Sequence, residues 1–147
     1  MLVDDDPVVR HVLSALLDED GIECVHAADG REGFRVLSEE LLSLDLLVTD
    51  LVMPNLSGDA LVLAVRELGG ERELPILVAS GHLDGERREA LRIAGADSVV
   101  DKSGGLAPVA AAARALLAAR GRLPPCLEQS GPAPVALGRI GLTRKRS

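Results

Sequence analysis

Aromatic residues are almost absent from this chain of 147 residues, which has no Trp, no Tyr and a single Phe, Phe34. Because 47% of the residues are nonetheless hydrophobic, we expect a core built from Leu, Val, Ile and Ala. The scarcity of rings argues against a protein that binds single-stranded nucleic acid by stacking bases on aromatic side chains.

Cysteine and long apolar runs are also scarce. Two cysteines, Cys24 and Cys126, are too few for a disulfide framework or a zinc site and are typical of a reducing compartment. No apolar run approaches the roughly 20 residues of a membrane-spanning helix. No signal-peptide pattern opens the printed sequence. We therefore expect a cytoplasmic chain without a membrane segment.

Charge is distributed unevenly along the chain. Residues 1–121 contain 11 Lys+Arg and 22 Asp+Glu, whereas residues 122–147 contain five basic residues and only Glu128. The second segment is also punctuated by Pro and Gly and shows no helical or strand periodicity. We expect 1–121 to be one folded domain and 122–147 to be a disordered basic tail or linker. The short cluster Arg144–Arg146 is weak evidence for nucleic-acid binding.

Short apolar runs alternate with helical patterns throughout residues 1–121. Continuous apolar strands are typical of a parallel sheet covered on both faces, so we predict a doubly wound α/β fold with five strands and five helices. Predicted strands cover Met1–Val3, Ile22–Ala27, Asp45–Thr49, Leu74–Ala79 and Ser98–Asp101, and predicted helices cover Val8–Leu17, Arg31–Leu42, Asp59–Leu68, Glu86–Ala94 and Ala107–Arg120.

Polar side chains stand at the ends of four predicted strands: Asp4–Asp6, Asp50, Ser80 and Lys102. In open α/β sheets, ligands bind beyond the carboxyl ends of the strands. Carboxylates gathered there would repel one another, which a divalent cation such as Mg²⁺ relieves. The hydroxyl and the ammonium group would then bind phosphoryl oxygens. An acidic triplet alone is more typical of a helix start, so the joint occurrence indicates the site.

These residues lie in stretches that resemble the receiver domain of two-component response regulators. The matching stretches are VDDDPVVR at Val3–Arg10, DLLVTDLVMPNLSG at Asp45–Gly58, PILVASG at Pro75–Gly81 and AGADSVVDK at Ala94–Lys102. With the helices between them, they cover essentially all of residues 1–120. The resemblance implies a flavodoxin-like sheet with strand order 2-1-3-4-5.

The resemblance also implies a phosphorelay function. Asp50 would accept a phosphoryl group from the phosphohistidine of a sensor histidine kinase or phosphotransfer domain, in an Mg²⁺-dependent reaction that switches the conformation and controls an output. The chain would catalyse its own phosphorylation and dephosphorylation rather than act as a conventional enzyme. Phosphorylation-dependent homodimerisation is a further hypothesis.

Each site residue then takes the role of the family position that it matches. Asp5, Asp50 and the backbone carbonyl of Val52 would bind Mg²⁺, and Asp4 would act through water. Ser80 and Lys102 would bind phosphoryl oxygens.

The sequence departs from the family pattern beside the lysine. Ser103 follows Lys102 where a proline with a cis peptide bond is usual, and a cis bond before a non-proline residue costs about 3 kcal/mol, so we predict a trans bond. Val99 occupies the position of the usual switch aromatic. We expect output contacts on the face formed by the fourth helix, the fifth strand and the fifth helix, with Val99 on it, although the missing ring puts the usual coupling in doubt.

Two further departures concern the start of the chain and the site. Only Met1–Val3 precede Asp4, where four or five residues are usual, which suggests a truncated or misplaced start. Val52 and His82 occupy positions from which side chains influence attack of water on an acyl phosphate. Because Val52 cannot hold a water, we expect slow self-dephosphorylation.

Three alternatives remain at this point. The sequence is equally consistent with a stand-alone regulator and with a fragment of a hybrid sensor kinase, whose C-terminal receivers its motifs resemble. It could be a binding module that no longer uses phosphate, as the Ser103 and Val99 departures would allow. It could also be a haloacid-dehalogenase-type phosphatase with Asp4 as nucleophile and Asp6 as acid/base, although Pro7 and the lack of a later acidic pair argue against that.

Overall fold

The computed structural model describes residues 1–69 and 73–122. Its strands form one five-stranded parallel sheet in the order β2-β1-β3-β4-β5. The predicted fold class and strand order are thereby confirmed. The strands are β1 (Leu2–Val3), β2 (His26–Ala27), β3 (Leu47–Asp50), β4 (Ile76–Ser80) and β5 (Ser98–Asp101).

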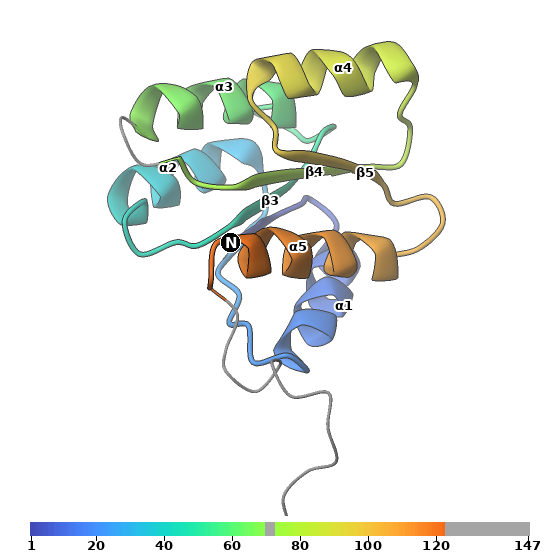
Figure 1. Ribbon diagram of the computed structural model, residues 1–147. Coiled ribbons are helices and arrows are strands. Elements are labelled where there is room, and N and C mark those ends of the chain that lie inside the picture. Colours follow the sequence, from blue (N-terminus) through green and yellow to red (C-terminus); the bar gives the residue numbers. More distant parts are fainter. Residues whose placement is uncertain (70–72, 123–147) are drawn as a thin grey trace, which may run out of the picture.

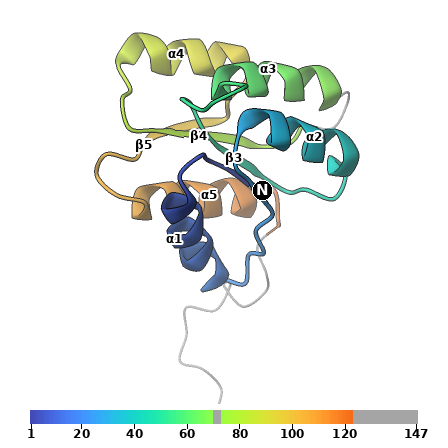
Figure 2. The same cartoon turned by 180° about the vertical axis from the view of Figure 1, so that it is seen from behind.

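Five helices cover both faces of this sheet among the described residues. Helices α1 and α5 lie on one face, and α2, α3 and α4 lie on the other (Figures 1 and 2). The helices are α1 (Pro7–Asp18), α2 (Gly30–Glu40), α3 (Gly58–Gly69), α4 (Gly85–Ala94) and α5 (Ala107–Ala119).

Local sequence signals explain where the helices begin. Aspartate side chains cap three of them: Asp6 accepts from the amide of Val8, and Asp29 and Asp84 cap α2 and α4 in the same way. Pro7 follows the first cap, where a missing N–H costs nothing. The carboxyl ends of the strands therefore lead into short, well-defined turns.

The core is aliphatic, as the composition predicts. Two clusters of buried side chains flank the sheet, one beneath α2, α3 and α4 and the other beneath α1 and α5. Phe34 is only partly buried and packs against the first cluster. Burial of these Leu, Val and Ile side chains, each contributing about 1.5–3 kcal/mol, supplies the main driving force for folding.

Several predicted ends differ in the structure, and those of β2 and α2 have a clear physical cause. Strand β2 covers only His26–Ala27 instead of Ile22–Ala27, because β1 offers just Leu2 and Val3 as ladder partners. Helix α2 ends at Glu40 instead of Leu42, because the amide and hydroxyl of Ser43 both donate to the Glu40 carbonyl and close the last turn. Both differences depend on tertiary or turn geometry that periodicity does not reveal.

Of the tail predicted from composition, only Arg122 belongs to the described residues. Its amide donates to the carbonyl of Leu117, and its guanidinium lies 3.5 Å from Asp45. Residues 123–147, which include Cys126 and Glu128, lie outside the described part, so the domain boundary stays a prediction. Within 1–69 and 73–122, no helix is long and apolar enough to span a membrane.

Candidate functional site

The sheet brings the predicted site residues to one edge. Asp4 follows β1, Asp50 ends β3, Ser80 ends β4 and Lys102 follows β5. Because all the strands are parallel, their carboxyl ends lie at the same edge, and the register pairs Asp50 with Ala79 and Ser80 with Asp101. The structure thus collects side chains that are up to 98 residues apart in the sequence.

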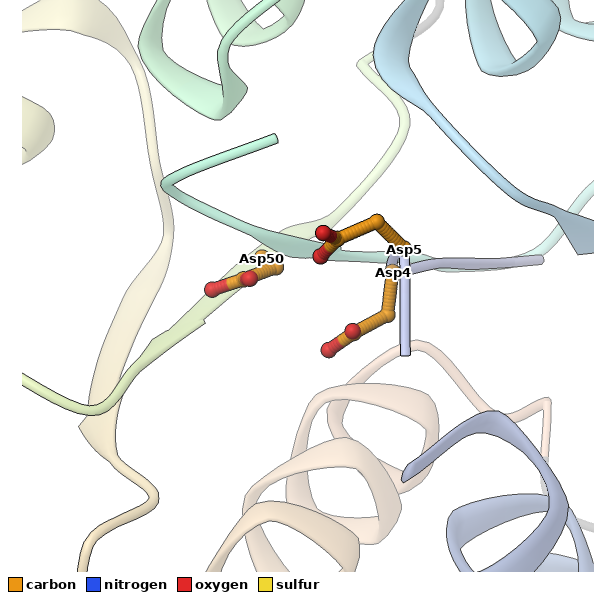
Figure 3. A group of neighbouring side chains, drawn as sticks. All are labelled: Asp4, Asp5 and Asp50. Atoms are coloured by element: carbon orange, nitrogen blue, oxygen red, sulfur yellow. The ribbon is translucent and has the colours of Figure 1, made fainter. Parts of the chain in front are cut away.

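Three carboxyl groups form the centre of this edge. Asp4, Asp5 and Asp50 each offer an oxygen, and these oxygens lie within 4.8 Å of one another. Figure 3 shows the three carboxyl groups pointing in the same general direction from two neighbouring strand ends. Asp4 is buried, Asp50 is half-buried and Asp5 is exposed. Hard oxygen donors at this spacing fit a divalent cation such as Mg²⁺.

Lys102 connects the carboxylates across the sheet. Its Nζ lies 2.8 Å from Asp4 and 3.3 Å from Asp50. Its backbone N–H donates to the Ser80 carbonyl at 3.0 Å, which fixes the start of the loop that carries it. The ammonium group therefore offsets part of the negative charge that the fold concentrates here.

Burial and neighbouring charges shift the protonation equilibria of this pair. Burial raises the pKa of Asp50, Lys102 opposes that effect, and the charge of Asp4 adds to it. Burial works to lower the pKa of Lys102, but the hydrogen bond to Asp4 and the charges of both carboxylates outweigh burial and raise it. The fold therefore disfavours the ionised form of Asp50 and favours the ionised form of Lys102.

The loop after β3 leaves no space above the Asp50 backbone. A Cβ on Gly58 would lie 2.1 Å from the Asp50 carbonyl oxygen, so only glycine permits this approach. The Gly58 amide donates to Leu51 at 2.8 Å, and the Leu51 amide donates to the Asp50 carboxylate at 2.7 Å. The side chain of Val52 points to solvent and is 70% exposed.

Ser80 is buried at the end of β4, and its hydroxyl oxygen lies 3.5 Å from the backbone amide of His82. The imidazole of His82 belongs to an exposed residue. The loop between β4 and α4 therefore has its first residues at the site, but His82 already lies at the surface.

The loop after Lys102 replaces the usual proline with a hydrogen-bonded turn. The peptide bonds of the described residues are all trans, as predicted for Lys102–Ser103. The Ser103 amide donates to Asp101 at 2.8 Å, and the Gly105 amide donates to the Lys102 carbonyl at 3.0 Å. These two bonds hold the loop without a cis peptide.

Val99 lies in β5, as its family position implies. Its side chain is 4% exposed and packs in the core cluster beneath α2, α3 and α4, so it offers little surface to the expected output face, which itself stays a prediction. An aliphatic side chain of this size fits inside the cluster. A polar contact also joins α4 to β5, because the Arg88 guanidinium donates to the Val99 carbonyl at 2.6 Å.

Sequence reasoning missed three polar residues near the site. Besides Arg88, the guanidinium of Arg10 donates to the Asp4 carbonyl, and Asn55 donates to Asp29 at 2.8 Å. Asn55 is the second residue after Met53 in the MPNLSG stretch, so its place in the loop was visible but its partner was not. The Arg88 and Asn55 contacts join separate elements that only the folded chain brings together, whereas Arg10 and Asp4 lie six residues apart in the turn from β1 into α1.

Known proteins share this arrangement. A family model described as the response regulator receiver domain matches residues 1–114. The chain belongs to the response regulator receiver family. Receiver domains act in two-component signalling, bind Mg²⁺ at an acidic pocket and interact with histidine kinases or phosphotransfer proteins.

Relatives of this receiver occur in proteins of different architecture. It is 31% identical over 102 residues to the sensor histidine kinase RcsC of Salmonella typhimurium, covering 69% of this chain and 10% of RcsC. A two-component response regulator of the LuxR family from Aurantimonas is 33% identical, with a TM-score of 0.71 and coverage of 84% of this chain and 85% of that one. The chain therefore spans only a tenth of the kinase but most of that solved chain.

One solved relative was crystallised with the cation. The receiver domain of the histidine kinase CKI1 from Arabidopsis thaliana, complexed with Mg²⁺, is 26% identical, with a TM-score of 0.69 and coverage of 78% of this receiver and 88% of that chain. That receiver is complexed with Mg²⁺, and the carboxylate cluster of this chain is an acidic pocket suited to the same cation.

Proposed function

We propose that Asp50 accepts a phosphoryl group from the phosphohistidine of a sensor histidine kinase or phosphotransfer domain. An Asp50 carboxylate oxygen forms the bond to phosphorus, the bond between phosphorus and the imidazole nitrogen breaks, and that nitrogen keeps the electron pair. The contact of Lys102 with both Asp4 and Asp50, beside the oxygen of Asp5, is the observation that carries this proposal.

The chain's own residues supply positioning and charge. The Lys102 ammonium binds a phosphoryl oxygen and leaves its contact with Asp50 as that carboxylate becomes esterified. The Ser80 hydroxyl, buried one strand away, turns to donate to a second phosphoryl oxygen. Such positioned charges and donors account for most of the catalysis of phosphoryl transfer.

We propose that Asp5, Asp50 and the backbone carbonyl of Val52 hold Mg²⁺ and that Asp4 acts on it through water. The three carboxyl oxygens within 4.8 Å of one another support this set. When bound, the cation neutralises charge on the transferring group.

The proposal extends to the surroundings of the reaction. The donor is a sensor histidine kinase or phosphotransfer partner in the cytoplasm, and the phosphorylated receiver switches conformation and controls an output partner. Phosphorylation-dependent homodimerisation belongs to the same proposal. Sedimentation with and without a phosphoryl mimic such as beryllofluoride tests it, and an unchanged sedimentation coefficient would remove the dimer from the account.

Incubation with acetyl phosphate tests the phosphorylation directly. We expect a covalent phosphoryl adduct on the wild-type chain in the presence of Mg²⁺, little adduct in EDTA, and none on Asp50→Asn. An adduct of equal yield on Asp50→Asn would show that another residue accepts the group.

A phosphorylation-independent binding module is the second candidate, favoured by the trans peptide at Ser103 and the buried Val99. Absence of the adduct from a folded, Mg²⁺-saturated chain would favour it. A phosphatase that uses Asp4 ranks behind both, because Asp4 is paired with Lys102 and Asp6 caps α1.

A further inference from the structure

A side-chain hydrogen bond joins the β3–α3 loop, which follows Asp50, to the start of helix α2. Asn55 Nδ2 donates to Asp29 Oδ2 at 2.8 Å across 26 residues. Asn55 has a φ of 67°, a left-handed conformation that Asn tolerates better than most residues. The conformation and the bond together set the course of the loop over residues 51–57.

Asp29 is a fixed anchor rather than a mobile surface carboxylate. Its other oxygen accepts from the Glu32 amide at 2.9 Å and caps α2, and the Glu32 side chain reaches back to the Ala28 amide at 2.7 Å. The bonds from the Glu32 amide and from Asn55 lower the pKa of Asp29, so the acceptor stays ionised at neutral pH.

The residues that follow Asp29 and Asn55, Gly30 and Leu56, make a second contact between the two segments. A Cβ on Gly30 would lie 2.1 Å from the Leu56 carbonyl oxygen, so the start of α2 and the loop touch through their backbones. Two consecutive residues of one segment thus meet two consecutive residues of the other. We name Asp29, Gly30, Asn55 and Leu56 the loop latch.

The loop latch holds the far side of a loop whose near side forms the site. On the near side, the Leu51 and Gly58 amides bond to the Asp50 carboxylate and the Leu51 carbonyl. Val52, whose carbonyl belongs to the proposed cation site, lies between these anchors and the latch. With both sides fixed, the backbone at Val52 has little freedom to turn.

We propose that Asp29 and Asn55 are positioning residues that hold the β3–α3 loop in the conformation required for its backbone to bind Mg²⁺ beside Asp50. This inference rests on the proposed function. An exposed hydrogen bond contributes little to global stability, so its effect belongs to the geometry of this loop. Removing partners that orient metal ligands typically lowers affinity 10–100-fold.

Three variants separate the bond from the backbone conformation. Asn55→Asp faces Asp29 with a second carboxylate and breaks the bond. The exchange Asp29→Asn with Asn55→Asp restores a donor and an acceptor while keeping a capping residue at 29. Asn55→Gly removes the amide and still permits the left-handed conformation. Asp84→Asn, at the cap of α4, is the matched control for changing a capping carboxylate.

Amide hydrogen exchange of residues 51–57 in metal-free protein is the first measurement, and the Mg²⁺ dissociation constant is the second. We expect faster amide exchange and about tenfold weaker Mg²⁺ binding for Asn55→Asp and Asn55→Gly, as for other residues that orient metal ligands. We expect recovery in the exchanged pair and no change in Asp84→Asn. Wild-type values in Asn55→Gly, or no recovery in the exchanged pair, would overturn the inference.

Failure of the proposed function looks different. If the wild-type chain neither binds Mg²⁺ nor forms the phosphoryl adduct, the function is wrong, whatever the exchange rates show. If wild type does both and the variants match it, only the positioning role is wrong.

Discussion

At the scale of single residues, the charge of Lys102 partly offsets the cost of burying the Asp50 carboxylate. The fold buries a carboxylate beside Asp4, and one ammonium group 3.3 Å from Asp50 offsets only part of the cost. Both residues were predicted from the sequence, because each stands at a strand end and parallel strands share an edge. Their mutual contact was not predictable, since it depends on how the loop after β5 turns.

The raised pKa of Asp50 predicts a pH dependence of stability. Because its folded pKa lies above its unfolded one, the proton it binds favours folding at low pH, and that contribution is lost as pH rises through the folded pKa. Asp50→Asn removes the ionised form. Without divalent cations we expect it to be more stable than wild type at neutral pH, and the difference to vanish below the ordinary carboxyl pKa.

Urea unfolding of both chains between acidic and neutral pH measures this difference. Glu89→Gln, at an exposed carboxyl group of α4, is the control. A constant difference between Asp50→Asn and wild type across the range would contradict the account of Asp50.

The side chain of Val52 is expected to give the phosphorylated state a long lifetime. Its side chain is 70% exposed beside the site and offers no group to hold an attacking water. We expect Val52→Asn to lose its phosphoryl group about tenfold faster than wild type, less than a full general base supplies. Decay of the adduct after removal of acetyl phosphate measures the rate, and equal decay of the two chains would contradict the prediction.

At the scale of elements, three helices begin with glycine, and their surroundings differ. A Cβ on the first residue of α2 or α3 would strike a backbone carbonyl, whereas one on the first residue of α4 would meet nothing within 4 Å. The sequence predicted Gly58 as a turn residue from its motif. It did not distinguish Gly30 from Gly85, because only packing against the β3–α3 loop makes Gly30 indispensable.

Gly58→Ala and Gly85→Ala are therefore a matched pair. We expect Gly58→Ala to lower the free energy of unfolding by about 3 kcal/mol, the upper end for an overpacked site, since the three nearest atoms are all backbone. We expect Gly85→Ala to raise it by about 0.5 kcal/mol, because alanine restricts the unfolded chain. Chemical denaturation measures both, and equal effects would contradict the packing account.

Element existence and order were predictable, whereas several ends were not. Apolar periodicity predicted five strands and five helices within residues 1–121. Strand β2 is shorter than its alternating pattern because the extent of its partner β1 limits it. Val99 was assigned to the switch position by resemblance, but its burial in the aliphatic core was not predicted.

At the scale of the whole molecule, the aliphatic core stabilises the fold and the acidic edge of the sheet carries the candidate site. Two clusters of Leu, Val and Ile side chains stabilise the sheet without aromatic packing. The parallel strands then carry carboxylates, a hydroxyl and an ammonium group to one edge. The fold thereby holds an electrostatically unfavourable group of carboxylates, which cation binding would relieve.

Mapping the acceptor residue tests the central claim most directly. Borohydride reduces an aspartyl phosphate to homoserine, so peptide mapping after treatment with acetyl phosphate, Mg²⁺ and borohydride identifies the residue. The account predicts homoserine at position 50 in wild type and none in Asp50→Asn. Homoserine at position 4, or none in a folded, Mg²⁺-saturated chain, would contradict it.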